Sequence, residues 1–229
     1  MAHARDHLGR LLLPLAAGAA GLCVAAMPGC DYMAAAAYVI EGPPKVERQF
    51  ELDDTKKVVV FVDDRSGTMP RKGLRRVIGQ TAEETLLAEK ALKAELVIPS
   101  AAAIAAVTQE KRGEPLSVVE VGRTVGADVV VYVNVEKFTL SRDGVGAGNQ
   151  PFAVAYVKVF DTASNRRIWP PESLGKPIMY TAAAGTQAPE TLGERAKAED
   201  ALAKRLGLEV ARLFFTYERD GASKRGTQL

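Results

Sequence analysis

The chain has 229 residues, of which 30 are basic and 28 acidic, giving a net charge of +2. The two signs are interspersed, so the sequence has no basic patch of the kind that binds nucleic acid. The only histidines are His3 and His7. If the chain is processed near residue 30, the mature protein has no histidine, which excludes a Ser-His-Asp triad, a Cys-His pair and a His-liganded zinc site.

Residues 1–29 have the pattern of an export signal. Arg5 and Arg10 give a positively charged start, and residues 11–27 carry no charge and are rich in Leu, Ala, Gly and Val. This order is typical of a signal peptide. The alternative is an uncleaved membrane span, but a span needs about 20 apolar residues, and Pro14 weakens this shorter stretch.

A short motif ends this segment at Cys30. Residues 27–30 read Met-Pro-Gly-Cys, which resembles the lipobox of bacterial lipoproteins. The resemblance implies cleavage before Cys30 and attachment of lipid, including palmitate, to that cysteine. Cys23, the other cysteine, would be removed with the signal peptide, so the mature chain could form no disulfide. The alternative is ordinary secretion, with cleavage at a later small-residue site such as residues 34–36.

Asp31, directly after Cys30, bears on the membrane that holds the anchor. At this place Asp resembles the signal that retains lipoproteins in the inner membrane of enteric bacteria, a rule that other bacteria do not share. We expect an exported protein anchored to the outer membrane and facing the periplasm, with the inner membrane as the alternative.

The remaining chain predicts a tether, one folded domain and a tail. Residues 30–56 include four consecutive alanines and Gly-Pro-Pro and lack a sustained apolar period, which favours a flexible tether. Residues 57–219 are expected to form the domain, and residues 220–229 a disordered tail.

Strand and helix patterns alternate in the first part of the domain. Residues 58–62 form an apolar, β-branched stretch typical of a strand buried on both faces. A helix is expected over residues 74–96, with its buried stripe at Leu74, Val77, Ile78, Thr81, Thr85, Ala88, Leu92 and Leu96. A short strand at residues 96–98 and a short helix at 100–109 follow. Ser117 and Glu120 form a capping box that begins a helix ending at Gly126.

The second part of the domain is mostly strands. Strands are expected from residue 129 towards 140, over 151–161, at 167–169 and near 178–183, followed by an amphipathic helix over 191–217. The order predicts an α/β (α+β) fold with a single mixed β-sheet covered by helices.

Two stretches resemble a group of periplasmic lipoproteins. Residues 118–132 pass from a helix through Gly-Ala-Asp into an apolar strand, and residues 156–169 form a strand, an Asp-containing turn and an apolar-Trp strand. Both are similar to lipoproteins related to the curli secretion channel, to the peptidoglycan-synthase activators and to the amino-terminal domain of the Tol-system periplasmic protein. The resemblance covers roughly residues 57–217, and it implies a fold rather than an activity.

Asp63 and Asp64 are the candidate ligand site because they end the first strand. Ligands of α/β sheets bind at strand ends, and a pair of carboxylates there suits a divalent cation or acid-base chemistry. The alternative is that they form a turn, since Asp is a common turn residue. We expect no metal, cofactor or catalytic residue.

These observations predict a non-catalytic binding, assembly or regulatory module for an envelope complex. Its partners would be an envelope protein and, through the lipid anchor, a membrane. Two alternatives stay open. One is an envelope enzyme that uses carboxylates, as glycoside hydrolases do. The other is a sensor of a small ligand.

Overall fold

The structure, a computed structural model, describes residues 44–109, 115–140, 150–182 and 189–219. Two compact units divide the chain: Met1–Pro44 with Arg219–Leu229, and Lys45–Glu218. In the first unit the Arg219 N–H donates a 3.0 Å hydrogen bond to the Pro44 carbonyl oxygen. The sheet, its helices and the hollows between them belong to the second unit.

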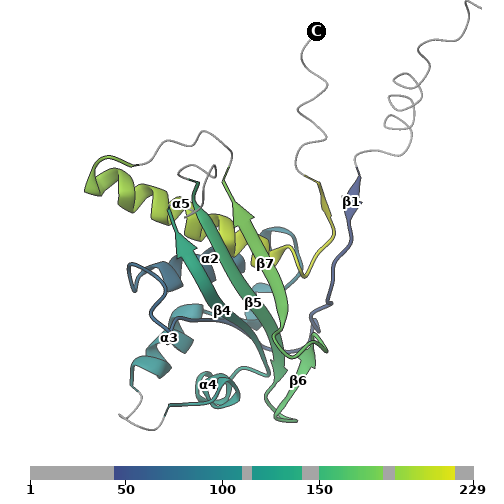
Figure 1. Ribbon diagram of the computed structural model, residues 1–229. Helices are drawn as coiled ribbons and strands as arrows, with labels where there is room; N and C mark the ends of the chain where they lie inside the picture. Colours follow the sequence, from purple (N-terminus) through teal and green to yellow (C-terminus); the bar gives the residue numbers. More distant parts are fainter. Residues whose placement is uncertain (1–43, 110–114, 141–149, 183–188, 220–229) are drawn as a thin grey trace, which may run out of the picture. The chain divides into compact units, whose positions relative to one another are not determined.

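A mixed six-stranded sheet forms the centre of this unit (Figure 1). The strand order is β3-β2-β4-β5-β6, and β7 pairs with β5 on the side away from β4. β2 is parallel to β3 and β4, whereas β5 is antiparallel to β4, β6 and β7. The bounds are β2 Val58–Asp63, β3 Val97–Ile98, β4 Val129–Thr139, β5 Phe152–Asp161, β6 Arg166–Trp169 and β7 Lys176–Thr181. The predicted fold class is therefore confirmed.

Helices cover both faces of the parallel half of the sheet. Those described are α2 Leu74–Ala88, α3 Ser100–Thr108, α4 Val118–Val125 and α5 Leu192–Ala211, with a 3-10 turn at Ala94–Leu96. α2 and α5 pack on the face that carries Val58, Val60 and Val62, and α3 and α4 on the face that carries Val59 and Phe61. All six residues of β2 are buried, because side chains alternate between two covered faces.

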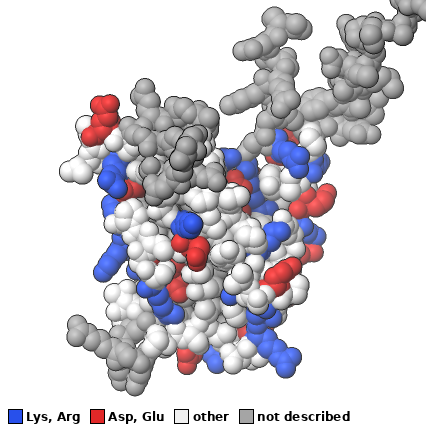
Figure 2. Space-filling model, in the orientation of Figure 1, with Lys and Arg blue, Asp and Glu red and all other residues white. Residues whose placement is uncertain are grey.

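One face of the antiparallel half of the sheet is open. On this face α4 is the last described helix, and no described helix covers the strands that follow it. β5 alternates between fully buried residues and the partly exposed Phe152, Val154, Tyr156 and Lys158. On this open face Val154 lies between Lys137 and Met179, and Met179 is 68% exposed. Figure 2 views the sheet from this side and shows mainly uncharged side chains over β4, β5 and β7. An antiparallel sheet tolerates such a face because its backbone is already paired.

Local signals in the sequence placed α4 correctly. The Ser117 side chain accepts a hydrogen bond from the Glu120 N–H, and the Glu120 carboxylate accepts one from the Ser117 N–H. The helix ends at Gly126 in the left-handed conformation, with φ of 77°. Capping box and glycine therefore do what the pattern predicted.

Three boundaries differ from expectation. α2 ends at Ala88 instead of residue 96, because Lys90 adopts a left-handed φ of 57° and the Leu86 carbonyl accepts the Ala91 N–H. Its buried stripe is shifted as well, comprising Leu74, Ile78, Gly79, Ala82 and Leu86. α5 ends at Ala211 instead of 217, and Leu192 at its start is exposed.

The third difference is a small second sheet. β1 (Lys45–Val46) pairs antiparallel with β8 (Tyr217–Glu218), and we call this pair the β1–β8 ribbon. Residues 45–56, which the sequence analysis gave to the tether, also contribute the buried Leu52 and the partly buried Phe50 to the main core. Phe50 packs against Trp169 and Phe214, with ring centroids 5.7 and 6.5 Å away.

Residues 1–43, with the expected signal peptide, Cys30 and Asp31, and residues 220–229, the expected tail, lie outside the described residues. Within the described ranges, no helix combines the length and apolar character needed to cross a bilayer.

Candidate functional site

Asp63 ends β2 with its carboxylate almost fully enclosed, at 3% exposure. It accepts hydrogen bonds from the Tyr132 hydroxyl (2.9 Å) and the Arg65 N–H (3.1 Å), and the Arg65 guanidinium lies 3.7 Å away. Burial, reinforced by the charge of Asp63, raises the pKa of Tyr132, so its hydroxyl stays a donor. Buried carboxylates need such partners, and Asp63 has them within its own neighbourhood.

Asp64 organises the loop that follows β2. One of its oxygens accepts hydrogen bonds from the Thr68 N–H (2.7 Å), the Thr68 hydroxyl (2.9 Å) and the Met69 N–H (3.2 Å). This is the turn-forming use of an aspartate. Across the described ranges, no group of three or more His, Cys, Asp or Glu side chains is placed to hold a metal ion.

The loop that Asp64 holds forms one wall of a small hollow at the carboxyl ends of β2 and β4. Its volume is about 160 Å³, and it is lined by Gly67, Thr68, Met69, Pro70, Phe138, Thr139, Leu140, Arg195 and Glu199. Glu199 is only 4% exposed. It pairs with Arg71 at 2.6 Å and with Arg195 at 3.4 Å. The place is where α/β sheets bind ligands, but ligand pockets usually have about 300–1,000 Å³.

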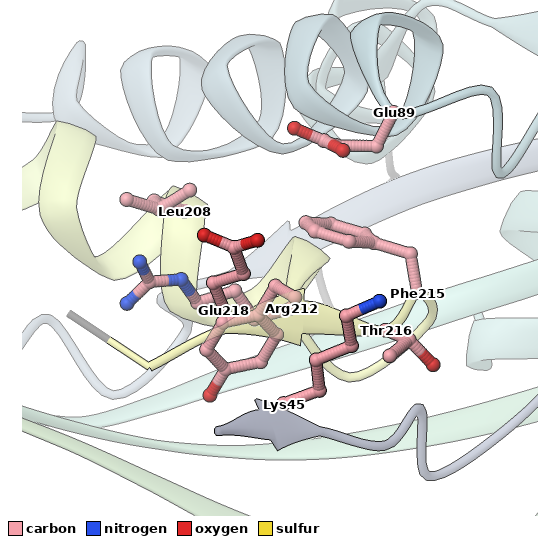
Figure 3. Close-up of a pocket in the computed structure, with 8 residues that line it drawn as sticks. Lys45, Glu89, Leu208, Arg212, Phe215, Thr216 and Glu218 are labelled. Atoms are coloured by element: carbon pink, nitrogen blue, oxygen red, sulfur yellow. The ribbon is translucent and has the colours of Figure 1, made fainter. Parts of the chain in front are cut away.

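A larger groove of about 580 Å³ lies at the other end of α5 (Figure 3). It is bounded by the end of α2, the end of α5 and the β1–β8 ribbon. Its lining residues are Lys45, Glu89, Leu208, Arg212, Phe215, Thr216, Tyr217 and Glu218. Its volume falls within the range of small-molecule sites.

The chain reaches this groove because α5 stops where a buried apolar segment begins. Leu213, Phe214 and Phe215 are all buried, and the Leu213 carbonyl accepts the N–H groups of Gln49 and Phe50 at 2.8 and 3.1 Å. The amino-terminal segment thus satisfies a carbonyl that the end of a helix leaves open. After this segment the chain continues into β8 of the β1–β8 ribbon.

The groove carries both signs of charge. The Arg212 guanidinium lies over the Tyr217 ring, 4.6 Å from its centroid, and bonds the Glu209 carboxylate at 2.9 Å. Lys45 and Glu218 face each other in the ribbon. Figure 3 shows Glu89 on the α2 side of the groove and Glu218 with Lys45 on the ribbon side. A mixed lining of this kind suits recognition of a polar surface.

A second hollow of about 150 Å³ shares Arg212 and Tyr217 with the groove. It runs beside β7 and is lined by Gln49, Lys176, Pro177, Ile178, Met179, Glu209, Arg212, Leu213 and Tyr217. We call the groove and this hollow together the Arg212–Tyr217 surface. The sequence analysis did not find it, since Tyr217 was expected in a helix and Lys45 in a tether.

No protein-family model matches the chain, and no curated protein matches it either. Solved structures with distant similarity include a hypothetical protein, CT253, from Chlamydia trachomatis, with 17% identity, a TM-score of 0.41, and 68% of this chain and 93% of that chain covered. The PelC dodecamer from Paraburkholderia phytofirmans has 12% identity and a TM-score of 0.41, with 75% of this chain and 97% of that chain covered. Lipoprotein GNA1162 from Neisseria meningitidis has 15% identity and a TM-score of 0.37, covering 62% and 91%. Likeness this distant establishes neither a family nor a function.

Proposed function

We propose that the chain is a lipid-anchored envelope protein that binds an envelope partner without catalysing a reaction. The observation that carries the proposal is the motif at residues 27–30, in which a Met-Pro-Gly-Cys sequence closes a charged and then apolar segment. A lipid on Cys30 would hold the mature protein at a membrane, with a strength set by the number of acyl chains.

The Arg212–Tyr217 surface is where we expect the partner to dock. The chain enters the folded unit at Lys45, which itself lines the groove. Lys45 follows Cys30 by fifteen residues (45 − 30), so at about 3.3 Å per residue the tether reaches at most about 50 Å. The acyl anchor would keep this surface within that distance of the membrane.

The bonding of Asp63 and Asp64 supports a binding role over a carboxylate enzyme. Asp64 accepts hydrogen bonds from its own loop, and Asp63 accepts hydrogen bonds from Tyr132 and Arg65. A catalytic carboxylate must reach the proton it transfers in a bound substrate. Asp63 is buried and lacks that access, and one oxygen of Asp64 is engaged by the Thr68 and Met69 N–H groups of its own loop.

A small-ligand sensor is the second candidate, and the volume of the groove favours it. At about 580 Å³ the groove is large enough for a metabolite. Its charged lining sets it apart from the mostly apolar pockets that enclose small ligands, and for this reason we place the protein partner first.

Metabolic labelling tests the anchor. Cells that express the chain are fed a clickable palmitate, and the wild type is compared with Cys30→Ala and with Cys23→Ala as the matched control. Label on the wild type and on Cys23→Ala, absent from Cys30→Ala, supports the proposal. Label that survives in Cys30→Ala, or that never appears, refutes the anchor at Cys30.

A further inference from the structure

β7 is an edge strand, and no described strand pairs with its outer side. Ala182 lies opposite Pro151, and its N–H donates a 2.9 Å hydrogen bond to the Pro151 carbonyl. Opposed residues of an antiparallel pair alternate between bonded and non-bonded positions. The register therefore turns the backbone groups of Pro177, Met179 and Thr181 away from β5. In the described part of the sheet, no strand pairs with this outer side of β7.

An edge with free backbone groups is a template for another strand unless the protein blocks it. β7 blocks only its first half. Pro177 has no N–H to donate, and Lys176 places a charge at the start of the strand. Met179 and Thr181 remain, each with one donor and one acceptor. That spacing is what an added extended strand requires.

The hollow beside β7 offers room for a side chain of such a strand. Ile178 points towards α5, because it is buried whereas its neighbour Met179 is 68% exposed. Together with Leu213 and Tyr217 it lines the hollow of about 150 Å³. An added strand places alternate side chains on the α5 side of the sheet. One apolar side chain of moderate size fits there.

Charge selects the kind of strand. Three basic side chains lie beside β7: Lys176 on the strand, Arg205 over the Tyr180 ring at 5.3 Å, and Arg212 in the lining of the hollow. The Glu209 carboxylate contacts both arginines, at 3.4 and 2.9 Å. Of the residues that line the hollow, Lys176 and Arg212 are basic and Glu209 is acidic, so together with Arg205 this described set has a net positive formal charge. A second copy of β7 would bring the same basic set against this one, whereas an acidic strand is attracted.

We infer that β7 binds an extended, acidic segment of a partner protein by strand addition, with an apolar side chain of that segment in the adjoining hollow. The inference rests on the proposed function, since it specifies how the partner meets the Arg212–Tyr217 surface. It predicts backbone pairing at Met179 and Thr181 and charge contacts with Lys176, Arg205 and Arg212.

Fluorescence anisotropy with short peptides tests the inference on the full chain in detergent micelles. The probe is an acetylated, fluorescein-labelled hexapeptide of alternating Val and Glu, and its matched control alternates Val and Lys. The acidic peptide is expected to bind at least tenfold more tightly than the basic one, with the difference shrinking as salt is raised. Equal binding of the two peptides, or no binding of the acidic one, would overturn the inference.

Met179→Pro removes the outward N–H but no bond to β5, since Met179 occupies a non-bonded position of that pair. Met179→Pro is expected to lower the affinity for the acidic peptide at least tenfold. Met179→Ala keeps the N–H, and its affinity for this peptide is expected to stay within threefold of the wild type. Circular dichroism checks that both variants fold. Lys176→Glu leaves the backbone intact, and it is expected to weaken binding of the acidic peptide and strengthen binding of the basic one.

Two results would contradict strand addition by a partner. The first is Met179→Pro binding the acidic peptide as tightly as the wild type. The second is a dimer in analytical ultracentrifugation that Met179→Pro dissociates, because the edge would then serve a second copy of the chain. Palmitate labelling reports on Cys30 alone, so failure of the anchor and failure of the edge are distinguishable.

Discussion

The Arg212 guanidinium lies over the ring of Tyr217, with 4.6 Å between the guanidinium carbon and the ring centroid. The two residues belong to both the groove and the hollow beside β7. Tyr217 also contacts Phe215 edge-on, at 6.0 Å between centroids. Arg212 and Tyr217 therefore link the two parts of the proposed docking surface.

Replacing the Tyr217 ring should lower the free energy of unfolding slightly and should weaken binding at the Arg212–Tyr217 surface more. Tyr217→Leu removes the cation–π and aromatic contacts, which together stabilise by about 1–2 kcal/mol, whereas Tyr217→Phe keeps both. Urea denaturation should show that loss in the leucine variant and a near-wild-type free energy of unfolding in the phenylalanine variant. Equal losses in the two variants would mean that the hydroxyl, and not the stack, matters.

Asp161 joins the end of β5 to the segment before β2. It accepts hydrogen bonds from Lys56 Nζ at 2.8 Å and from the Ser164 N–H and hydroxyl at 2.7 Å each. The Lys56 bond first, and then those from Ser164, lower the pKa of Asp161. Because these are charge-assisted bonds to a nearly buried carboxylate, Asp161→Asn should reduce the free energy of unfolding by about 2–3 kcal/mol at pH 7.

The same contact gives a pH dependence of known sign. The pKa of Asp161 is lower in the folded state than in the unfolded chain, so its stabilisation is present above the unfolded value, about 4, and is lost as the pH falls below it. Urea titrations at pH 7 and pH 3 should therefore show the gap between wild type and Asp161→Asn shrinking at pH 3. The control is Asp54→Asn, which breaks an exposed pair with Lys93 and should change stability by less than about 1 kcal/mol at either pH.

Asp64 is predicted to stabilise its loop. Asp64→Ala removes the acceptor of three hydrogen bonds and should lower the free energy of unfolding by about 1–3 kcal/mol. Hydrogen exchange at the Thr68 and Met69 amides should speed up. Ser66→Ala, at an exposed position of the same loop, should leave both unchanged. Loss of an envelope activity in Asp64→Ala, with exchange and stability unaltered, would favour the carboxylate enzyme instead.

The contact of α2 with α5 depends on Gly207. A Cβ at this position would lie 2.5 Å from the Ile78 carbonyl oxygen and 2.9 Å from the Thr81 Cβ. Gly207→Ala should force the helices apart and cost about 1–3 kcal/mol of stability. Gly193→Ala is the matched control in the same helix, where a Cβ meets nothing within 4 Å, and it should leave stability unchanged or raise it by up to about 1 kcal/mol. A Gly207→Ala variant as stable as the control would rule out the close contact.

Local signals predicted the elements that local physics determines. Ser117, Glu120 and Gly126 specify both ends of α4 within ten residues, and the apolar stretch at 58–62 matches β2. The ends of α2 and α5 depend on other forces. The chain turns at Lys90, after α2, and no glycine at that position marks the turn in the sequence. α5 ends because Leu213 to Phe215 enter a core that distant segments build.

The candidate site divides in the same way. Asp63 and Asp64 could be placed at a strand end because they follow β2 directly, but their hydrogen-bond partners, such as Tyr132, lie far along the chain or in the loop. The groove draws on Lys45, Glu89 and residues 208–218, and no spacing in the sequence links them. The β1–β8 ribbon has two residues per strand, too few to produce an alternating pattern.

The mass of the mature amino terminus tests the central claim most directly. The protein is extracted from membranes, digested, and its first peptide is identified by mass spectrometry. A lipid-anchored protein should begin at Cys30 and carry the added mass of acyl chains, and Cys30→Ala should lose that species. A peptide that begins at Met1 or after residues 34–36, without acyl mass, would contradict the anchor and leave a membrane-spanning or freely secreted protein.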